Sequence, residues 1–119
     1  MTPLKEVALF TPNVERVAAF YESLLGISPI ASMPGMNSYL LGGVDFHIHV
    51  AEQVLPARQP APFGDFPPGE DHIAFACDDL DAAAVALIAE GHTVLGPMDF
   101  PWGRSMYVRD PDGRLVELS

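Results

Sequence analysis

Residues 4–26 read LKEVALFTPNVERVAAFYESLLG, and this stretch places a strand directly before a helix. Apolar residues alternate with others from Leu4 to Thr11, which is typical of a strand with one buried face. Asn13 is a favourable helix N-cap, apolar residues then recur at helical spacing, and Gly26 stands where a left-handed C-terminal cap belongs. The stretch therefore predicts a strand followed by a helix.

The next part of the chain predicts three shorter strands, so the first module has the order βαβββ and spans about residues 1–51. A Gly42-Gly43 turn is favourable for a hairpin between the last two of these strands. We expect the three strands at about residues 27–33, 36–41 and 44–51.

The same order begins again at Asp71, after a proline-rich stretch of about residues 52–70 that we interpret as a linker. Residues 71–91 read DHIAFACDDLDAAAVALIAEG, in which a strand to Cys77 precedes a helix that is capped by Asp79 and ended by Gly91. We therefore expect one α+β domain over residues 1–119, built from two tandem βαβββ modules. The second module spans about residues 71–119, and its last strands are expected at 92–95, 104–109 and 114–118.

The composition limits the classes of function. The 119 residues include six basic and sixteen acidic ones, giving a net charge of −10, and 49% are hydrophobic. The acidic balance argues against nucleic acid or an anionic membrane surface as partner. No apolar run approaches the roughly 20 residues of a membrane span. Cys77 is the only cysteine, so an intrachain disulfide cannot form. We expect a cytoplasmic protein that binds a small molecule.

The repeat also predicts a metal site. Glu6 and His72 each precede a helix cap by seven residues, and His47 and Glu117 each follow a turn glycine by four. Strand alternation places all four opposite the apolar faces, which we expect the helices to cover. Two imidazoles and two carboxylates suit Zn²⁺, Ni²⁺, Mn²⁺ or Fe²⁺. We predict that these four residues bind one cation, with His49 as the alternative to His47, and that Glu6 or Glu117 acts as the catalytic base.

Further residues are candidates for a substrate pocket near these ligands. Most of them are aromatic, and aromatic side chains suit the core or a dimer contact equally well. The candidates are His49, Phe10, Tyr39, Trp102, Arg104 and Tyr107.

The two quoted stretches, together with RDPDGRLVEL at residues 109–118, resemble the glyoxalase, bleomycin-resistance and extradiol-dioxygenase superfamily, also called vicinal oxygen chelate proteins. The resemblance implies that the modules form a half-open mixed β-barrel with the helices packed outside and a metal inside, often in a homodimer. It implies His where Glu6 stands and Glu where His47 stands, so this chain exchanges the two types. Glutathione-using relatives carry Arg and Asn where Phe10 and Ala51 stand, so we do not expect glutathione hemithioacetal as the substrate.

Two function classes follow from this resemblance. The first is a metal-dependent enzyme that binds a small oxygen-rich substrate to a divalent cation, with lyase, isomerase or dioxygenase chemistry. The second is a metal-free protein that sequesters a cationic antibiotic or a small metabolite, as bleomycin-resistance relatives do. The net charge of −10 is compatible with attracting a cation. The paired His and Glu residues at symmetric positions favour the enzyme.

Overall fold

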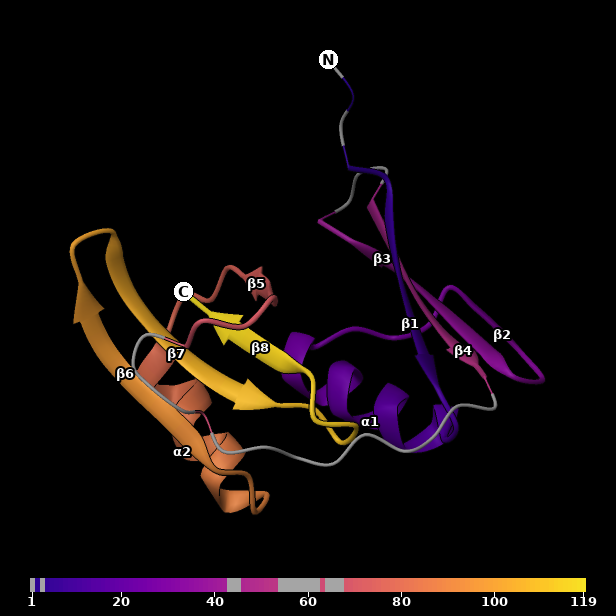
Figure 1. The fold of residues 1–119 in the computed structure, drawn as a ribbon. Helices are drawn as coiled ribbons and strands as arrows, with labels where there is room; N and C mark the ends of the chain where they lie inside the picture. The colour runs from indigo at the N-terminus through magenta and orange to yellow at the C-terminus, as the bar shows by residue number, and fades with distance from the viewer. Residues whose placement is uncertain (1, 3, 43–45, 54–62, 64–67) are drawn as a thin grey trace. The chain divides into compact units, whose positions relative to one another are not determined.

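The computed structural model describes residues 2, 4–42, 46–53, 63 and 68–119 (Figure 1). The chain divides into two compact units, Met1–Ala57 and Arg58–Ser119. Each unit has four strands and one helix in the order βαβββ, which confirms the predicted α+β class and the repeat. Most of the predicted linker, and the Gly43 half of the predicted hairpin turn, lie outside the described residues.

Unit 1 is a mixed four-stranded sheet with a helix on one face (Figure 1). Its first and last strands run parallel to each other, and the strand order is β1-β4-β3-β2. Helix α1 contacts β3 and β4. The elements are β1 (Glu6–Thr11), α1 (Val14–Leu25), β2 (Ala31–Met33), β3 (Met36–Leu41) and β4 (Phe46–Glu52).

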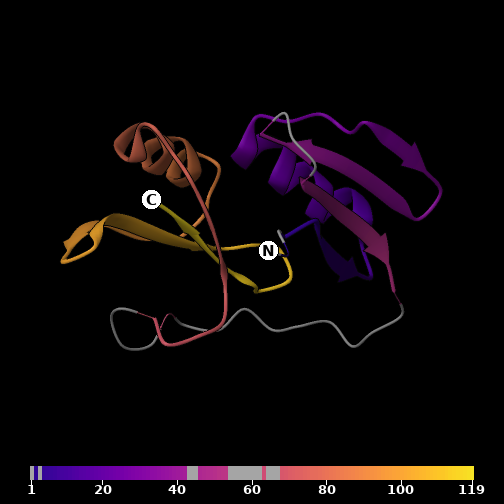
Figure 2. The ribbon, with the colours of Figure 1, turned by 90° about the horizontal axis from the view of Figure 1, so that it is seen from above.

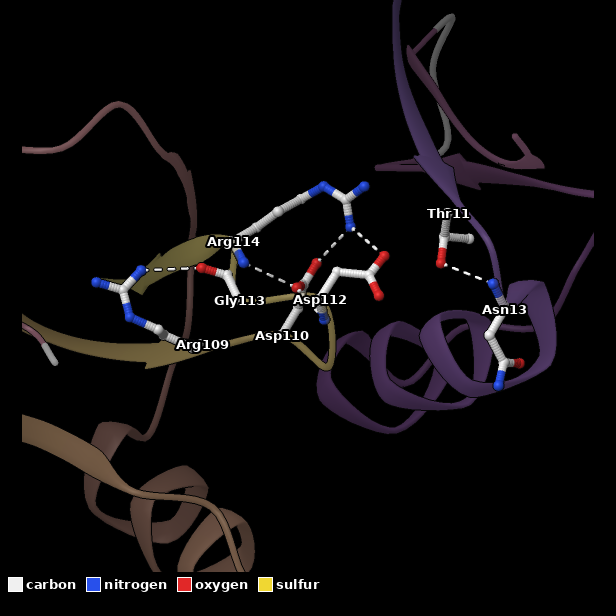
Figure 3. Close-up of polar contacts among 7 residues, drawn as sticks. All are labelled: Thr11, Asn13, Arg109, Asp110, Asp112, Gly113 and Arg114. Atoms are coloured by element: carbon white, nitrogen blue, oxygen red, sulfur yellow. Dashed lines mark hydrogen bonds and ion pairs between the residues drawn. The ribbon is translucent and has the colours of Figure 1, made fainter. Parts of the chain in front are cut away.

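Helix α1 begins and ends at the residues that the capping pattern predicts. The Asn13 side chain accepts a hydrogen bond from the backbone N–H of Arg16 at 3.1 Å. The Asn13 N–H in turn donates to the Thr11 hydroxyl oxygen at 3.1 Å (Figure 3). Gly26 has a φ of 63°, in the left-handed region that glycine adopts without strain. These contacts satisfy backbone groups that the helix itself leaves unpaired.

The core of unit 1 lies between α1 and one face of the sheet. Strand alternation turns every second residue of the sheet toward the helix, and the apolar set predicted from this alternation is the buried one. Full burial of an aliphatic side chain contributes roughly 1.5–3 kcal/mol, so this layer is the main stabilising feature of the unit. Its fully buried residues include Val17, Tyr21, Tyr39, Ile48 and Val50.

Unit 2 repeats this topology, with the strand order β5-β8-β7-β6 and a parallel β5–β8 pair. Helix α2 contacts β6 and β7, and Figure 2 shows it as a layer along one face of the sheet. In the described part of the chain, the eight strands form two separate sheets rather than one closed barrel. The elements are β5 (Ile73–Phe75), α2 (Leu80–Ala89), β6 (Val94–Phe100), β7 (Gly103–Arg109) and β8 (Leu115–Leu118).

Three strands differ most from their predicted ranges. Strand β2 begins at Ala31 rather than at residue 27, and β5 is shorter than the predicted 71–77, so His72 directly precedes it. Strand β6 continues to Phe100, beyond the predicted 92–95, because a register irregularity between Leu95 and Met98 accommodates a proline within the strand. No helix in the described residues is long and apolar enough to cross a membrane.

The turn between β7 and β8 is held by buried ion pairs (Figure 3). One carboxylate oxygen of Asp110 accepts hydrogen bonds from the backbone N–H groups of Asp112 and Arg114, both at 2.9 Å. The other oxygen of Asp110 accepts from the Arg114 guanidinium at 3.0 Å. The same guanidinium also donates to the Asp112 carboxylate at 3.2 Å. Gly113 has a φ of 88° in this turn. The network fixes the hairpin that carries Glu117.

Candidate functional site

In unit 1, an acid and an imidazole meet on the sheet face opposite α1. The His49 Nε2 atom of β4 lies 2.6 Å from the Glu6 Oε2 atom of β1. The backbone partner of Glu6 is His47, so this contact runs diagonally across the two strands. The His49 Nδ1 atom lies 2.8 Å from the Ser38 hydroxyl oxygen of β3. Three strands therefore contribute to one polar row, Ser38–His49–Glu6.

His47 lies beside this row. Its ring stacks on that of His49, with centroids 5.9 Å apart and an interplanar angle of 28°. Of the two histidines left open by the sequence, His49 is the one in contact with Glu6. The Glu6 side chain is 55% exposed, so its carboxylate is open to water.

In unit 2, an acid and an imidazole are also hydrogen-bonded to each other, and they have more hydrogen-bond partners than the pair in unit 1. The His72 Nε2 atom lies 2.8 Å from the Glu117 Oε1 atom. The Ser105 hydroxyl donates to the Glu117 Oε2 atom at 2.9 Å, and the Tyr107 hydroxyl donates to the same carboxylate. The His72 Nδ1 atom lies 2.7 Å from the backbone carbonyl oxygen of Glu70. The Glu117 side chain is only 12% exposed.

The surroundings of His72 place a hydrogen-bond acceptor at each ring nitrogen, the Glu70 carbonyl at Nδ1 and the Glu117 carboxylate at Nε2. The Glu70 carbonyl can only accept a hydrogen bond, so the Nδ1 atom must donate. This carbonyl, and then the Glu117 carboxylate, raise the pKa of His72 above its ordinary value, while burial acts in the opposite direction. The Nε2 atom, which donates to Glu117 in this structure, is therefore the nitrogen that could bind a cation once it releases its proton. Metal-binding histidines commonly donate their other N–H to a backbone carbonyl in this way.

The two acid–imidazole pairs occupy equivalent backbone positions, with the acid and the imidazole exchanged. Val7 lies opposite Ile48 in unit 1, as Ile73 lies opposite Val116 in unit 2. In each unit, one member of the acid–imidazole pair comes one residue before this apolar pair on the first strand. The other member comes one residue after it on the last strand. The equivalent residues are Glu6 with His72, and His49 with Glu117.

The predicted equivalence of His47 with Glu117 is therefore wrong by two residues. That prediction counted from a turn glycine and assumed that both connections have the same length. His49 lies six residues after Gly43, whereas Glu117 lies four residues after Gly113. The backbone register, not the turn, defines the equivalent positions.

Four of the six predicted pocket residues lie on the polar faces or near a turn. His49 and Tyr107 belong to the two pairs described above. Phe10 is on the same face of β1 as Glu6 and is 46% exposed. Trp102 lies in the turn between β6 and β7, is 63% exposed, and stacks on Phe100 with centroids 4.6 Å apart.

The other two predicted pocket residues lie on the helix-facing sides of the sheets. Tyr39 is fully buried and donates a hydrogen bond to the Glu22 carboxylate of α1 at 2.8 Å. Burial, followed by this bond, raises the pKa of Tyr39 to about 12. Arg104 forms a two-pronged ion pair with Asp81 of α2, at 3.0 and 3.1 Å. Both residues join a helix to its sheet, away from the acid–imidazole pairs.

Two residues of the site, Ser38 and Ser105, were missed from the sequence. Strand pairing within each hairpin is the feature that could have identified them. Ser38 lies opposite His49 in the register. Ser105 lies two residues before Tyr107, which is opposite Glu117. Alternation along β3 and β7 places both serines on the polar faces of the sheets.

The donor chemistry of the pairs fits a divalent cation. No group of three or more His, Cys, Asp or Glu side chains able to hold a metal ion is found within the residues that the structure describes. Each unit supplies one imidazole and one carboxylate, and both residue types bind cations of borderline hardness. The orientation of His72 by a backbone carbonyl is a further feature in common with metal-binding histidines.

Comparison with known proteins identifies the family. Uncharacterized protein PA2024 of Pseudomonas aeruginosa is 31% identical, over 100% of this chain and 89% of that protein. The virulence protein STM3117 of Salmonella typhimurium is 25% identical, over 98% of this chain and 82% of that protein. The crystal structure of TnmS3, an antibiotic binding protein from Streptomyces sp. CB03234, is 25% identical with a TM-score of 0.74, covering 100% of this chain and 95% of that one. Residues 4–118 match the family model, so the chain belongs to the Glyoxalase/Bleomycin resistance protein/Dioxygenase superfamily.

Proposed function

We propose that this chain is a metal-dependent enzyme that binds a small, oxygen-rich substrate to a divalent cation. The proposed ligands are Glu6 and His49 from unit 1 and His72 and Glu117 from unit 2. One observation carries the proposal: each unit presents a bonded carboxylate and imidazole at the equivalent place on the polar face of its sheet. Packing alone does not require this repeated pairing, and both residue types are ones that a cation of borderline hardness uses as ligands.

The donor set indicates which cations to expect. Two imidazole nitrogens and two carboxylates suit Zn²⁺, Ni²⁺, Mn²⁺ or Fe²⁺, whereas Ca²⁺ and Mg²⁺ prefer oxygen ligands alone. Four protein ligands leave open positions in a six-coordinate shell for two substrate oxygens. When bound, the cation would supply Lewis-acid polarisation of a substrate oxygen.

Glu6 is the better candidate for the general base. Its carboxylate is largely exposed, and among the described residues its partner is His49 alone. Glu117 is mostly buried and accepts hydrogen bonds from three side chains, so it is held in place. A base must reach the substrate proton, and a carboxylate on the cation can be displaced towards it; an exposed carboxylate with one partner is suited to do so. Proton removal from carbon by Glu6 supports isomerase or lyase chemistry.

Calorimetric titration of the four cations into chelator-stripped protein tests the metal site. We expect tight, stoichiometric binding to the wild type, and its loss in His72→Ala and Glu117→Ala. His92→Ala is the matched control, because it removes an imidazole of unit 2 that is not one of the proposed ligands, and it should bind as the wild type does. Absence of stoichiometric binding to the wild type would contradict the proposal.

Two assays distinguish the reaction classes once a cation binds. With α-hydroxycarbonyl compounds in deuterated water, we expect deuterium incorporation by the wild type and none by Glu6→Gln. Oxygen consumption by the Fe²⁺-loaded protein with a vicinal diol, without deuterium exchange, would indicate dioxygenase chemistry instead.

The second candidate function is metal-free sequestration of a cationic antibiotic. Similarity to the antibiotic binding protein TnmS3 over the whole chain supports it, as do the net charge of −10 and the partly exposed Phe10 on the same face of β1 as Glu6. In this case the metal-free protein would bind a bleomycin-type cation with submicromolar affinity, unaffected by His72→Ala. Binding that requires an added metal would contradict this alternative.

We also propose that the protein is a homodimer, as superfamily members often are. Each sheet has two edge strands, which a partner copy can protect. Light scattering of the purified protein at several concentrations should give twice the chain mass, and a monomer mass throughout would contradict this. Cytoplasmic location and the lack of a nucleic-acid partner stay predictions.

A further inference from the structure

The Glu117 carboxylate is surrounded by hydrogen-bond donors in a way that the Glu6 carboxylate is not. The Ser105 hydroxyl donates to its Oε2 atom at 2.9 Å, the His72 ring faces its Oε1 atom at 2.8 Å, and the Tyr107 hydroxyl donates to it as well. Ser105 is fully buried and Tyr107 nearly so. Hydrogen bonds to an ionised carboxylate are roughly twice as strong as bonds between neutral groups. This carboxylate is therefore fixed in one orientation before any ligand arrives.

The donors occur only in the unit whose last strand carries the carboxylate. Ser38 of β3 lies opposite His49, as Tyr107 of β7 lies opposite Glu117. The residue two positions before Ser38 is Met36, at the place where unit 2 has Ser105. Unit 1 therefore has a methionine thioether where unit 2 has a serine hydroxyl. The hydroxyl occurs in the unit whose last strand carries the carboxylate of the pair, and the thioether in the unit whose last strand carries the imidazole.

The arrangement also leaves one carboxylate oxygen directed at the histidine. Because Ser105 occupies the Oε2 atom, the Oε1 atom faces the His72 Nε2 atom. The Nδ1 atom of His72 is already committed to the Glu70 carbonyl. The two atoms that face each other are thus an oxygen and a nitrogen that both suit a cation of borderline hardness.

We infer that Ser105 and Tyr107 are positioning residues that hold Glu117 for the cation, so that the His72–Glu117 pair is preformed. This inference rests on the proposed function. Removing a partner of a ligating carboxylate typically lowers metal affinity 10- to 100-fold. We expect a loss of about that size for Ser105→Ala and for Tyr107→Phe.

The matched control is Tyr39→Phe. Tyr39 is also a buried tyrosine that donates to a glutamate, but its partner Glu22 is on α1 and is not a proposed ligand. This variant should be less stable than the wild type in urea and bind Co²⁺ as tightly. Ser105→Thr keeps a hydroxyl at the same position and should restore most of the affinity that Ser105→Ala loses.

The experiment is calorimetric titration of Co²⁺ into the full chain, with the visible absorption spectrum of the bound Co²⁺ and the urea midpoint of the metal-free protein recorded for each variant. A positioning role predicts weaker binding and a changed spectrum in Ser105→Ala and Tyr107→Phe. Wild-type affinity and spectrum in both variants would overturn the inference while leaving the proposed function intact. No Co²⁺ binding to the wild type would remove the proposed function and the inference with it. If Ser105→Ala fails to fold, Tyr107→Phe decides.

Discussion

The acid–imidazole pairs of the two units share a place on their sheets but differ in how firmly they are held. In unit 2, the Glu117 carboxylate is mostly buried and accepts from three side chains. In unit 1, the Glu6 carboxylate is largely exposed, and His49 alone is bonded to it among the described residues. The repeat thus conserves the backbone position of the pair, while the neighbouring side chains decide which half is rigid.

The two histidines differ in a related way. His72 donates its Nδ1 proton to a backbone carbonyl, which can only accept a hydrogen bond. His49 has the Ser38 hydroxyl at its Nδ1 atom, and a hydroxyl can either donate or accept. The Nδ1 atom of His72 is therefore fixed as a donor, which leaves only its Nε2 atom for a cation, whereas the Nδ1 atom of His49 can either donate to Ser38 or accept from it.

The hairpin that carries Glu117 is the first place to test this difference in rigidity. Asp110→Ala removes a buried carboxylate that holds two backbone N–H groups and Arg114, so we expect a loss of about 3 kcal/mol in the free energy of unfolding. Asp112→Ala, which removes a 3.2 Å contact to the same arginine, should cost less than half as much. Urea denaturation measures both, and equal losses would show that the network does not centre on Asp110.

The largest effect on metal binding should come from the preformed half. We expect His72→Gln to weaken Co²⁺ binding by more than about 100-fold, beyond the usual effect of losing an outer partner of a ligand. His49→Gln, on the exposed pair, should weaken it by about 10-fold, since binding there must first reorganise Ser38 and Glu6. Calorimetry of both variants compares the halves directly. A greater loss of affinity in His49→Gln than in His72→Gln would contradict the proposed difference between the two pairs.

The fold was largely predictable from local patterns, but the site only partly. Caps at Asn13 and Gly26 and the alternation along β1 and β4 depend on residues close in sequence, and these predictions are confirmed. The equivalence of His49 with Glu117 could not be found by counting from turn glycines, because the two connections differ by two residues. Only the strand register carries that information.

The placement of the pocket candidates shows a second limit. Tyr39 and Arg104 look like pocket residues by type, yet each faces a helix and bonds to it. The predicted site uses alternation along the first and last strands of each unit, β1, β4, β5 and β8. The same alternation along β3 and β7 places Tyr39 and Arg104 on the apolar side. Their partners, Glu22 and Asp81, are far away in sequence, so nothing local signals these contacts.

His47 and His49 offer a finer test on a single strand. They stand two residues apart on the same face of β4, but the described contact with Glu6 is made by His49. We expect His47→Gln to change Co²⁺ affinity by less than about threefold, compared with about 10-fold for His49→Gln. Titration of the two variants side by side measures this. A greater loss in His47→Gln would show that His47 is the ligand.

The helix–sheet layer of unit 1 can be tested at Tyr39, whose buried bond to Glu22 joins β3 to α1. Its folded-state pKa of about 12 lies above the value of about 10 in the unfolded chain. Between these values the folded state keeps a proton that the unfolded state releases, so this contribution to stability is fully present below about pH 10 and is lost as the pH rises through about 12. The wild type should therefore lose stability with a slope that approaches about 1.4 kcal/mol per pH unit, which Tyr39→Phe lacks. Urea midpoints of both proteins from about pH 9 to about pH 11 measure the difference. Parallel curves would mean that the pKa of Tyr39 is the same in the folded and the unfolded state, and would contradict the buried Tyr39–Glu22 bond.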